Sequence, residues 1–338
     1  MKKEKSIPVY FQLFYLILSA GFCFLYFKKI VAGVDFNAPN SINAVTSLQT
    51  AKPYQFRLLI PLIFMLLKPL ALAPEKILYI IYDFVIVYLT IVVYYKLLRE
   101  YFTDKKIVLF LAPVIIYPML FNYVILNQSF QYYDFTSILL FTLGLYFIIK
   151  NNFKWFLISF IIAVINKETA VYLIFAFIFF NYKNIFTRKI ILNTILLGLI
   201  FAGYKIMLAY IFRSNPGDNV EVGFGVNMEI LTSFYKNRVY AKNLGLNFGG
   251  LYLFTILLFV TGRWKVFTSK SPAKLMYLNF AFIPYLIVGI FVTYFTEVRV
   301  YSELIPMITT LFLIYLSTFK KLSIETVQIE NSRIIGRK

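Results

Sequence analysis

The amino-acid sequence predicts an all-α, polytopic membrane protein with about ten transmembrane helices and further short helices at one membrane surface. Composition is the first reason: 60% of the 338 residues are hydrophobic and only 14% are charged, whereas a soluble domain is roughly half apolar and about 25% charged. The second reason is that the apolar residues form runs suited to crossing about 30 Å of hydrocarbon. The third is that Lys and Arg lie mostly in short segments between those runs, as in cytoplasmic loops of membrane proteins. We therefore expect one integral domain over residues 1–338, located in the cell (inner) membrane.

Ten apolar runs predict the membrane spans. Several are short and would take residues from the flanking loops to reach spanning length. No tandem or inverted repeat relates them to one another. The runs lie near residues 8–31, 77–98, 106–126, 134–149, 154–166, 168–182, 189–212, 250–262, 275–296 and 302–319.

A further apolar run, 58–73, is interpreted as a re-entrant or interfacial helix because it contains two prolines and Lys68. Backbone of this kind is tolerated at membrane depth where protein or water covers it. If this run does not cross, most of the 34 Lys and Arg residues share one side, which the positive-inside rule assigns to the cytoplasm. Both termini are then cytoplasmic, and two long outer segments remain, 28–76 and 213–249.

The residue types restrict the chemistry. The chain has no histidine and one cysteine, Cys23, which excludes an intrachain disulfide and a thiolate metal cluster. Catalysis would therefore rest on carboxylates, Lys, Arg, Tyr and amides. No metal site is predicted, although the sequence leaves a divalent metal open. The net charge of +19 does not indicate nucleic-acid binding, because no basic stripe alternates with exposed aromatic residues.

Asp35 is the acidic residue whose position is least explained by a stabilising role at the start of a helix. It follows the C-terminal end of the first span, where the helix dipole disfavours negative charge, and no helix begins at it. A short amphipathic helix predicted at 42–50, capped by Asn40 or Ser41, would then lie on the membrane surface. The alternative is that Asp35 is simply a solvated loop acid. Four other acids stand at the outer start of a span, where the dipole alone can explain them: Glu75, Asp134, Glu168 and Glu303.

Two cationic residues in unusual places are candidates for binding an anion. Arg57 stands at the start of the 58–73 run and offers a fork of donors suited to phosphate oxygens. Lys205 is the one lysine inside a long apolar run, where a charge by default marks a functional site. For both residues the alternative is snorkelling of the charged group to the membrane surface.

Two short polar stretches complete the candidate site. The Asn166-Lys167-Glu168-Thr169 turn interrupts an apolar stretch and begins a helix, whose free N–H groups beside Lys167 predict an anion site. Glu297 and Arg299 lie at the outer end of another span. Their alternative interpretation is a surface ion pair of little energetic value.

The order of these features resembles a known family. Asp35, a short helix and then Lys52-Pro53-Tyr54-Gln55-Phe56-Arg57-Leu58-Leu59-Ile60-Pro61 are similar to the first lumenal loop of GT-C glycosyltransferases. The most similar members are the polyprenyl-phosphate-mannose-dependent mannosyltransferases. The resemblance continues through a span with the central Asp83, the loop from Asn127-Gln128-Ser129 to Asp134, and the Asn-Lys-Glu-Thr turn. It covers residues 1–180, whereas 181–338 matches as a variable helical half with a Glu-x-Arg motif. Many members carry paired acids where this chain has Asp35 alone.

The resemblance implies an inverting glycosyltransferase. It would move a sugar from a polyprenyl-phosphate donor to a glycan, lipid or protein acceptor at the outer face of the membrane. Asp35 would be the catalytic base. The donor phosphate would be bound by Arg57, Lys167, Lys205 and Arg299. The sugar and acceptor would be bound by Tyr54, Gln128, Asp134, Glu168 and Glu297. No cofactor is assigned, and the remaining expected partner is membrane lipid.

Two other functions remain as alternatives. An O-antigen-type polysaccharide polymerase would centre its chemistry on the second outer segment, with Arg213, Arg238 and Lys242, and would not need an acid and surface helix in the first. A lipid or glycan flippase or transporter usually shows repeats and broken helices in matching positions of two halves, and here the one broken run lies in one half.

Overall fold

The structure, a computed structural model, describes residues 7–38, 41–70, 74–127, 130–218, 223–233, 238–260, 282–292 and 297–319. Within these ranges every regular element is helical and no strand is present, which confirms the predicted all-α class. The α-helices are α1 (Val9–Lys29), α2 (Ile42–Thr46), α3 (Leu59–Leu67), α4 (Glu75–Leu98), α5 (Lys105–Leu111), α6 (Ile116–Met119), α7 (Asp134–Ile149), α8 (Phe153–Asn166), α9 (Val171–Phe180), α10 (Arg188–Ile211), α11 (Phe224–Ser233), α12 (Arg238–Leu246), α13 (Leu251–Val260), α16 (Phe282–Val292) and α17 (Ile305–Phe319).

Four helical stretches are long and apolar enough to cross a membrane. They are Val9–Gly33, Glu75–Leu98, Lys105–Ile125 and Arg188–Ile211. Three further predicted spans form shorter apolar helices: Asp134–Ile149, Phe153–Asn166 and Glu168–Phe180. Of the predicted spans 250–262 and 275–296, the structure describes only α13 and α16, and the last predicted span begins as the 3₁₀ helix η9 (Val298–Leu304) before α17. The membrane-crossing character is therefore supported, but the count of ten spans is not.

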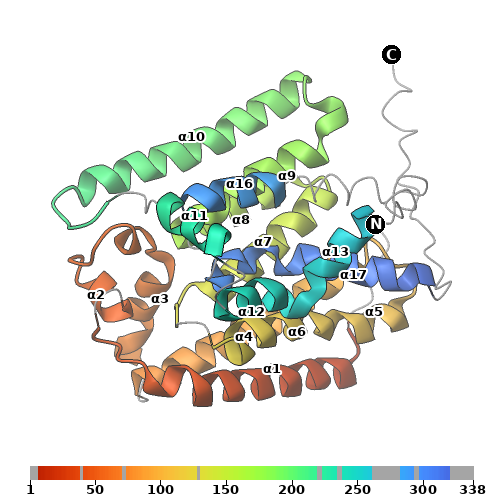
Figure 1. The fold of residues 1–338 in the computed structure, drawn as a ribbon, viewed down its shortest axis with the longest axis horizontal. Helices are drawn as coiled ribbons and strands as arrows, with labels where there is room; N and C mark the ends of the chain where they lie inside the picture. The colour runs from red at the N-terminus through yellow and green to blue at the C-terminus, as the bar shows by residue number, and fades with distance from the viewer. Residues whose placement is uncertain are drawn as a thin grey trace.

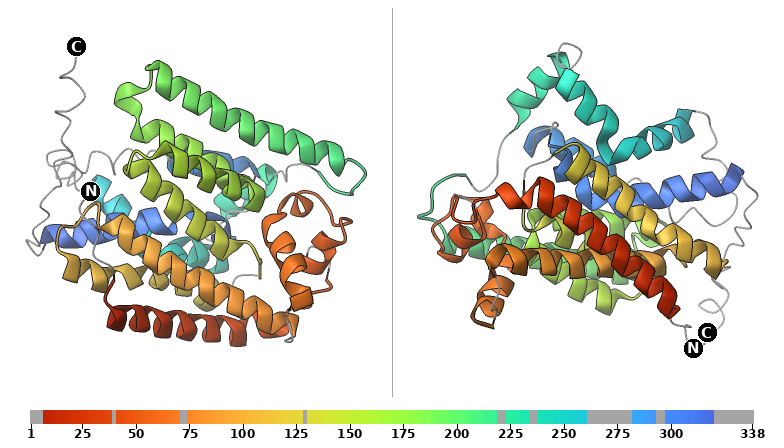
Figure 2. Two further views of the ribbon diagram at one scale, coloured as in Figure 1. Left: turned by 180° about the vertical axis from the view of Figure 1, so that it is seen from behind. Right: turned by 90° about the horizontal axis from the view of Figure 1, so that it is seen from below.

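The helices form a bundle in which successive long elements run back and forth (Figure 1). α2 and α3 lie together at one end of this bundle, and α1 begins at the opposite end, as the views in Figure 2 also show. We call the end that carries α2 and α3 the α2–α3 end. The segments that meet there are 30–58, 130–133, 166–170, 212–218 and 297–303.

The run predicted to be re-entrant forms α3, followed by the 3₁₀ turn η3 (Lys68–Leu70). α3 has nine residues, which at 1.5 Å per residue reach only about 14 Å. The helix is therefore too short to cross about 30 Å of hydrocarbon by itself. It packs beside α2 at the α2–α3 end, where an interfacial helix would lie (Figure 1).

The predicted surface helix 42–50 is shorter than expected. α2 begins after Ser41, whose hydroxyl accepts a hydrogen bond from the backbone N–H of Ala44 at 3.3 Å. Ile42 and Val45 are buried as the amphipathic pattern predicts. The helix ends before Leu48, which has φ of +62° and is exposed, because a left-handed residue cannot continue a right-handed helix.

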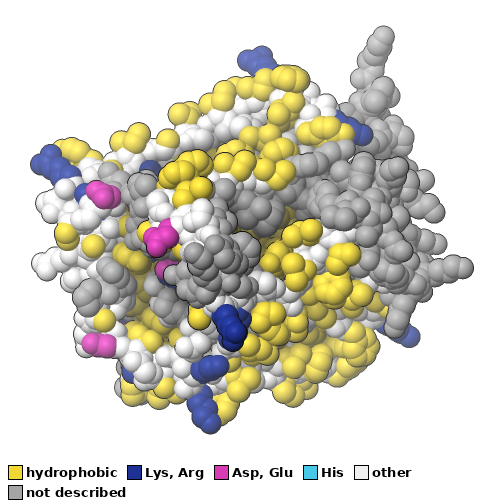
Figure 3. Space-filling view, viewed as in Figure 1, with side chains coloured by type: hydrophobic (Ala, Val, Ile, Leu, Met, Phe, Trp, Pro, Cys, Tyr) yellow, Lys and Arg dark blue, Asp and Glu magenta, His cyan; other side chains and the backbone are white. Residues whose placement is uncertain are grey.

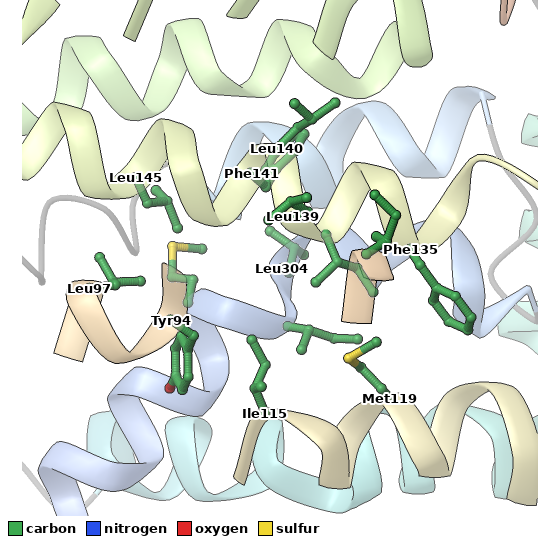
Figure 4. Packing of buried hydrophobic residues seen from close by; sticks show 14 of the residues in the cluster. Tyr94, Leu97, Ile115, Met119, Phe135, Leu139, Leu140, Phe141, Leu145 and Leu304 are labelled. Carbon is green, nitrogen blue, oxygen red and sulfur yellow. The ribbon is translucent and has the colours of Figure 1, made fainter. Parts of the chain in front are cut away.

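The core is centred on α7, which is buried on almost every side. Figure 4 shows its side chains meeting others from α4, from α6 with the 3₁₀ turn η4 (Ala112–Ile115) before it, and from η9. The labelled residues there include Tyr94, Leu97, Ile115, Met119, Leu139, Phe141 and Leu304. α9 approaches α7 closely at Gly144, where a Cβ atom would lie 2.8 Å from Leu173 Cδ2.

α10 is the opposite case, since only 11% of its apolar window is buried. It lies along the outside of the bundle (Figure 1). Large apolar side chains such as Leu199, Ile206 and Tyr210 are exposed on it. Figure 3 shows hydrophobic side chains over much of the visible surface, whereas the acidic side chains seen from this side lie at the α2–α3 end. Such a flank suits contact with lipid rather than water.

Candidate functional site

Two clusters of charged side chains lie at the α2–α3 end, and both use the 166–170 turn. α8 ends at Asn166, Lys167 is extended with φ of −161° and ψ of 146°, and the 3₁₀ turn η6 (Glu168–Ala170) leads into α9. Asn166 fixes the turn, because its Nδ2 donates to the Tyr133 carbonyl at 3.1 Å and to Ser137 Oγ at 2.8 Å. The extended backbone sends the neighbouring side chains of Lys167 and Glu168 into different clusters.

The first cluster, which we call the open cluster, consists of Arg57, Glu168 and Lys205. The Arg57 guanidinium donates to both carboxylate oxygens of Glu168, through Nη2 to Oε1 and through Nε to Oε2 at 3.2 Å. Lys205 Nζ lies 3.9 Å from Glu168 Oε2. The Glu168 side chain is 32% exposed and that of Lys205 is 23% exposed, whereas that of Arg57 is 9% exposed. A carboxylate thus bridges two cations at a partly open surface.

Aromatic groups hold Arg57 in place. Its Nη1 donates to the Tyr133 hydroxyl, and the guanidinium carbon lies 4.4 Å from the centre of the Tyr133 ring and 5.0 Å from that of Tyr54. Burial alone would lower the pKa of Arg57, but the charge of Glu168 outweighs burial and raises this pKa above its ordinary value. The guanidinium is therefore a fixed positive charge. Lys205 has a ring contact as well, since its Nζ lies 5.2 Å from the centre of the Phe56 ring.

The loop that carries Arg57 is tied down from several sides. Within the loop, Gln55 Nε2 donates to the Val45 carbonyl at 3.0 Å, and its Oε1 accepts from the Thr50 N–H at 3.1 Å. The Leu58 N–H donates to the Ile165 carbonyl at 3.2 Å, which joins the loop to α8. These bonds give Arg57 its position beside the 166–170 turn.

The start of the second predicted outer segment also packs on this loop. Asn215 Nδ2 donates to the carbonyls of Leu48 at 3.0 Å and Thr50 at 2.9 Å, and the Lys52 N–H donates to the Pro216 carbonyl at 2.8 Å. Gly217 has φ of +85°, and a Cβ atom there would lie 2.6 Å from the Lys52 carbonyl oxygen. The contact therefore requires glycine. The two predicted outer segments meet at residues more than 160 positions apart in the chain.

The second cluster, which we call the sealed cluster, consists of Lys167, Asp134 and Glu303. Lys167 Nζ lies 2.7 Å from Glu303 Oε1 and 3.4 Å from Asp134 Oδ1. The hydroxyls of Thr169 and Tyr285 each donate to Glu303 at 2.8 Å. Each of the three charged side chains is at most 5% exposed. Burial alone would lower the pKa of Lys167, but the charges of Glu303 and Asp134 outweigh it and raise this pKa above its ordinary value.

Glu297 and Arg299 form an ion pair beside the sealed cluster. Arg299 Nη2 lies 2.9 Å from Glu297 Oε2. The Arg299 side chain is 7% exposed, and the Glu297 side chain is 37% exposed. Burial alone would lower the pKa of Arg299, but Tyr133 and Asp134 outweigh burial and raise it. The alternative predicted for this pair, a surface ion pair of little energetic value, therefore fits the partly exposed Glu297 better than the buried Arg299.

The structure brings together most of the residues that the sequence singled out. Eight of them lie in or beside the two clusters: Tyr54, Arg57, Asp134, Lys167, Glu168, Lys205, Glu297 and Arg299. Glu303, interpreted from sequence as a helix-start acid, instead lies inside η9 and binds Lys167. Tyr133 and Tyr285 were not predicted. The signal available for Tyr133 was its place directly before Asp134 in a short outer loop. For Glu303 the signal was its place four residues after Arg299.

Among the described residues, Asp35 is not bonded to a member of either cluster. It is exposed, and its Oδ1 accepts a hydrogen bond from the Asn37 N–H at 2.9 Å. Asn43 Nδ2 in turn donates to Asn37 Oδ1 and to Glu75 Oε2, each at 3.0 Å. No interaction found among the described residues joins Asp35 to Arg57. Gln128 lies outside the described residues.

The residues on which the polymerase alternative depends lie elsewhere. The Arg213 guanidinium is 5.3 Å from the centre of the Tyr210 ring, and Arg238 and Lys242 are exposed on α12. In the part of the chain that the structure describes, none of the three is ion-paired to a member of the open or sealed cluster. The same part of the chain holds no group of three His, Cys, Asp or Glu side chains placed to bind a metal ion.

The open cluster has the charge and the donor geometry that suit an anion. It presents two cations about a partly exposed position that a carboxylate now occupies, and Arg57 offers the planar donor fork that matches carboxylate and phosphate. In the sealed cluster the one cation is already paired with two acids and closed to solvent, which suits a structural role. No protein-family model matches the chain, and neither a curated protein nor a solved structure does.

Proposed function

We propose that this protein is an inverting glycosyltransferase of the cell (inner) membrane that takes its sugar from a polyprenyl-phosphate donor. In this proposal the chain has about ten spans, both termini are cytoplasmic, and the α2–α3 end faces outward. The observation that carries it is the open cluster, in which Arg57 and Lys205 flank a partly exposed anion position at the end of apolar helices. A donor whose tail lies among apolar helices would bring its phosphate to such a position.

The leaving phosphate has a defined place in this proposal. As the bond between the anomeric carbon and the phosphate oxygen breaks, its electron pair moves to the phosphate, and preformed positive groups stabilise that charge. We assign this role to Arg57 and Lys205. Lys167 was also predicted to bind phosphate, but it is 5% exposed and already paired with two acids. Its proposed role is to position the 166–170 turn, while Arg299 supplies positive charge from its place beside the sealed cluster.

Asp35 remains the proposed catalytic base. The acceptor hydroxyl would give its proton to the Asp35 carboxylate while its oxygen attacks the anomeric carbon from the face opposite the phosphate. Asp35 is exposed at the α2–α3 end, so an acceptor arriving from water can reach it. Tyr54, Glu168 and Glu297, which are partly exposed at the same end, are proposed to bind sugar or acceptor hydroxyls. Asp134 is 1% exposed and would act on them only through Lys167.

Donor hydrolysis tests the proposal without knowledge of the acceptor, because water takes the acceptor's place. Protein reconstituted in lipid is given a polyprenyl-phosphate hexose, and release of free sugar is measured. Asp35→Asn should lower the rate by about 10²–10⁴-fold, the usual contribution of a positioned base. The matched control is Asp104→Asn, since Asp104 caps α5 by accepting from the Lys106 N–H at 2.8 Å. If Asp35→Asn keeps the parental rate, the base is a different acid; if the parent protein never releases sugar, the donor class is wrong.

Cysteine labelling tests the proposed topology. With Cys23 replaced by Ala, single cysteines are placed at Ala38, at Lys76 and at Thr103. We expect the first two to react with an impermeant reagent from outside, and Thr103→Cys to react only after the membrane is opened. Labelling of Lys76→Cys from the cytoplasm together with Ala38→Cys from outside would mean that the 58–73 run crosses the membrane.

A further inference from the structure

We infer that the Glu168 carboxylate occupies the phosphate position of the empty protein, so that donor binding is an exchange of one anion for another. On this inference, which rests on the proposed function, Glu168 leaves Arg57 and Lys205 when the phosphate arrives and returns when the product departs. Glu168 then competes with the donor phosphate for these two cations instead of binding the phosphate.

The bonding of Glu168 is that of a bound anion. Both of its oxygens accept from the Arg57 fork, and Oε2 also faces Lys205 Nζ at 3.9 Å. Carboxylate and phosphate groups bind the arginine fork in the same bidentate way. A phosphate that used both cations would therefore need the space and the donors that the Glu168 carboxylate now takes.

Exposure and anchoring indicate which member of the cluster moves. Arg57 is held by the Tyr133 hydroxyl and lies over two rings, and its side chain is 9% exposed. The Glu168 side chain is 32% exposed and belongs to a short 3₁₀ turn that follows the extended residue Lys167. The carboxylate can therefore swing into solvent by side-chain rotation, whereas the guanidinium cannot leave without exposing a cavity. The cations stay and the acid moves.

The charges favour such an exchange. A sugar-bearing phosphodiester carries one negative charge, as the Glu168 carboxylate does, so the exchange leaves the local charge unchanged. After transfer, the product is a phosphomonoester, whose second ionisation near pH 6 gives it most of a second charge at neutral pH. This product would bind the two cations more strongly than the donor does. Return of Glu168 between the cations would then assist product release.

The test compares Glu168→Gln with the parent protein. Glutamine keeps the size of the side chain but removes the competing charge, so affinity for a short-chain fluorescent polyprenyl phosphate should rise by about tenfold or more, as expected when a charged hydrogen-bonded competitor is lost. The dissociation rate should fall by a similar factor. The matched control is Glu75→Gln, because Glu75 is an ion-paired acid at the same end, 3.4 Å from Lys68, and lies outside the site. This control should leave the affinity unchanged.

A second probe separates this inference from the proposed function. Inorganic phosphate is titrated against the same proteins, with the rise in melting temperature as the measurement. If Glu168→Gln binds inorganic phosphate more tightly than the parent but binds polyprenyl phosphate no more tightly, the exchange is supported and the lipid donor is rejected. If the variant binds neither probe more tightly, or binds either probe more weakly, Glu168 orients Arg57 instead and the inference is wrong. Should Glu168→Gln fail to fold, Glu168→Asp serves the same purpose, because its shorter side chain cannot bridge both cations; unchanged or weaker binding by that variant overturns the inference.

Discussion

The open and sealed clusters use the same kinds of side chain, a cation and a carboxylate, and differ in what surrounds them. Lys167 and Glu168 are neighbours in the sequence, yet Lys167 is 5% exposed between two acids while Glu168 is 32% exposed between two cations. The charge-paired residues at this end of the bundle therefore divide into a part enclosed by the fold and a part that solvent can reach.

The physical difference between the two clusters is how far solvent reaches their charged groups. In the sealed cluster, removal of one partner leaves a buried charge that water cannot reach, which is far more costly than the loss of an exposed pair. In the open cluster, water screens the pair formed by Lys205 and Glu168, so this pair adds little to folding. Binding sites need the second situation, because a group that is held too firmly cannot make room for a ligand.

The largest expected effect is on the sealed cluster. Glu303→Ala removes the closest partner of Lys167 and the acceptor used by Thr169 and Tyr285. The free energy of unfolding should fall by about 3–5 kcal/mol, because the buried charge of Lys167 loses its closest partner and keeps only Asp134 at 3.4 Å. Thermal unfolding in detergent measures this change. Glu100→Ala is the control, since Glu100 pairs with the 40% exposed Lys150 and should cost about 1 kcal/mol or less. Equal stability of the two variants would remove the distinction between the clusters.

The next effect concerns the donor fork of the open cluster. Arg57→Lys keeps the charge but loses the bidentate geometry and the stacking on Tyr54 and Tyr133. Polyprenyl-phosphate affinity should fall by about 10- to 100-fold, corresponding to one or two charged hydrogen bonds. Equilibrium binding measures this loss, and Arg99→Lys, at the opposite end of the bundle, is the control. Parental affinity in Arg57→Lys would show that only the charge matters.

Gly217 connects the second predicted outer segment to the loop that carries Arg57. Gly217→Ala places a Cβ atom 2.6 Å from the Lys52 carbonyl oxygen at a positive φ, at a cost of about 1–3 kcal/mol. Because the strain is confined to this contact, donor affinity should fall while the sealed cluster and its contribution to stability remain. Binding and thermal unfolding are measured together, with Gly198→Ala on α10, where a Cβ atom meets nothing within 4 Å, as the control. A loss of stability without loss of affinity would uncouple the loop from the site.

The smallest effect is expected at Lys205. Lys205→Met keeps a long apolar side chain in α10 but removes a charge that is 23% exposed and 3.9 Å from Glu168. Donor affinity should fall less than in Arg57→Lys, by about tenfold at most, with folding unchanged. Lys189→Met, on the same helix, is the control for a lysine far from the cluster. If Lys205→Met binds the donor as the parent does, snorkelling is the correct interpretation of Lys205.

Much of the candidate site could be predicted from sequence because its members are unusual for their surroundings. A lysine in an apolar run, an arginine at the start of a proline-containing run and a polar turn between two apolar stretches each contradict the local pattern. The structure gathers Lys205, Arg57 and the 166–170 turn at one end of the bundle. The role of Asp35 stays a prediction, since its position in the chain indicated an unexplained acid but not what lies opposite it.

By itself the sequence determined the helical membrane-protein class, since that depends on composition and on the length of apolar runs. It also located the 166–170 turn, because the local polar residues that interrupt the apolar stretch act on the backbone beside them. Only the tertiary structure decided which partner each charge has. Glu303 lies 136 positions after Lys167 in the chain, and Glu168 lies 111 positions after Arg57, so no local pattern specifies these contacts. They arise where the ends of packed helices come together, and the solvent exposure of each pair then distinguishes the sealed cluster from the open one.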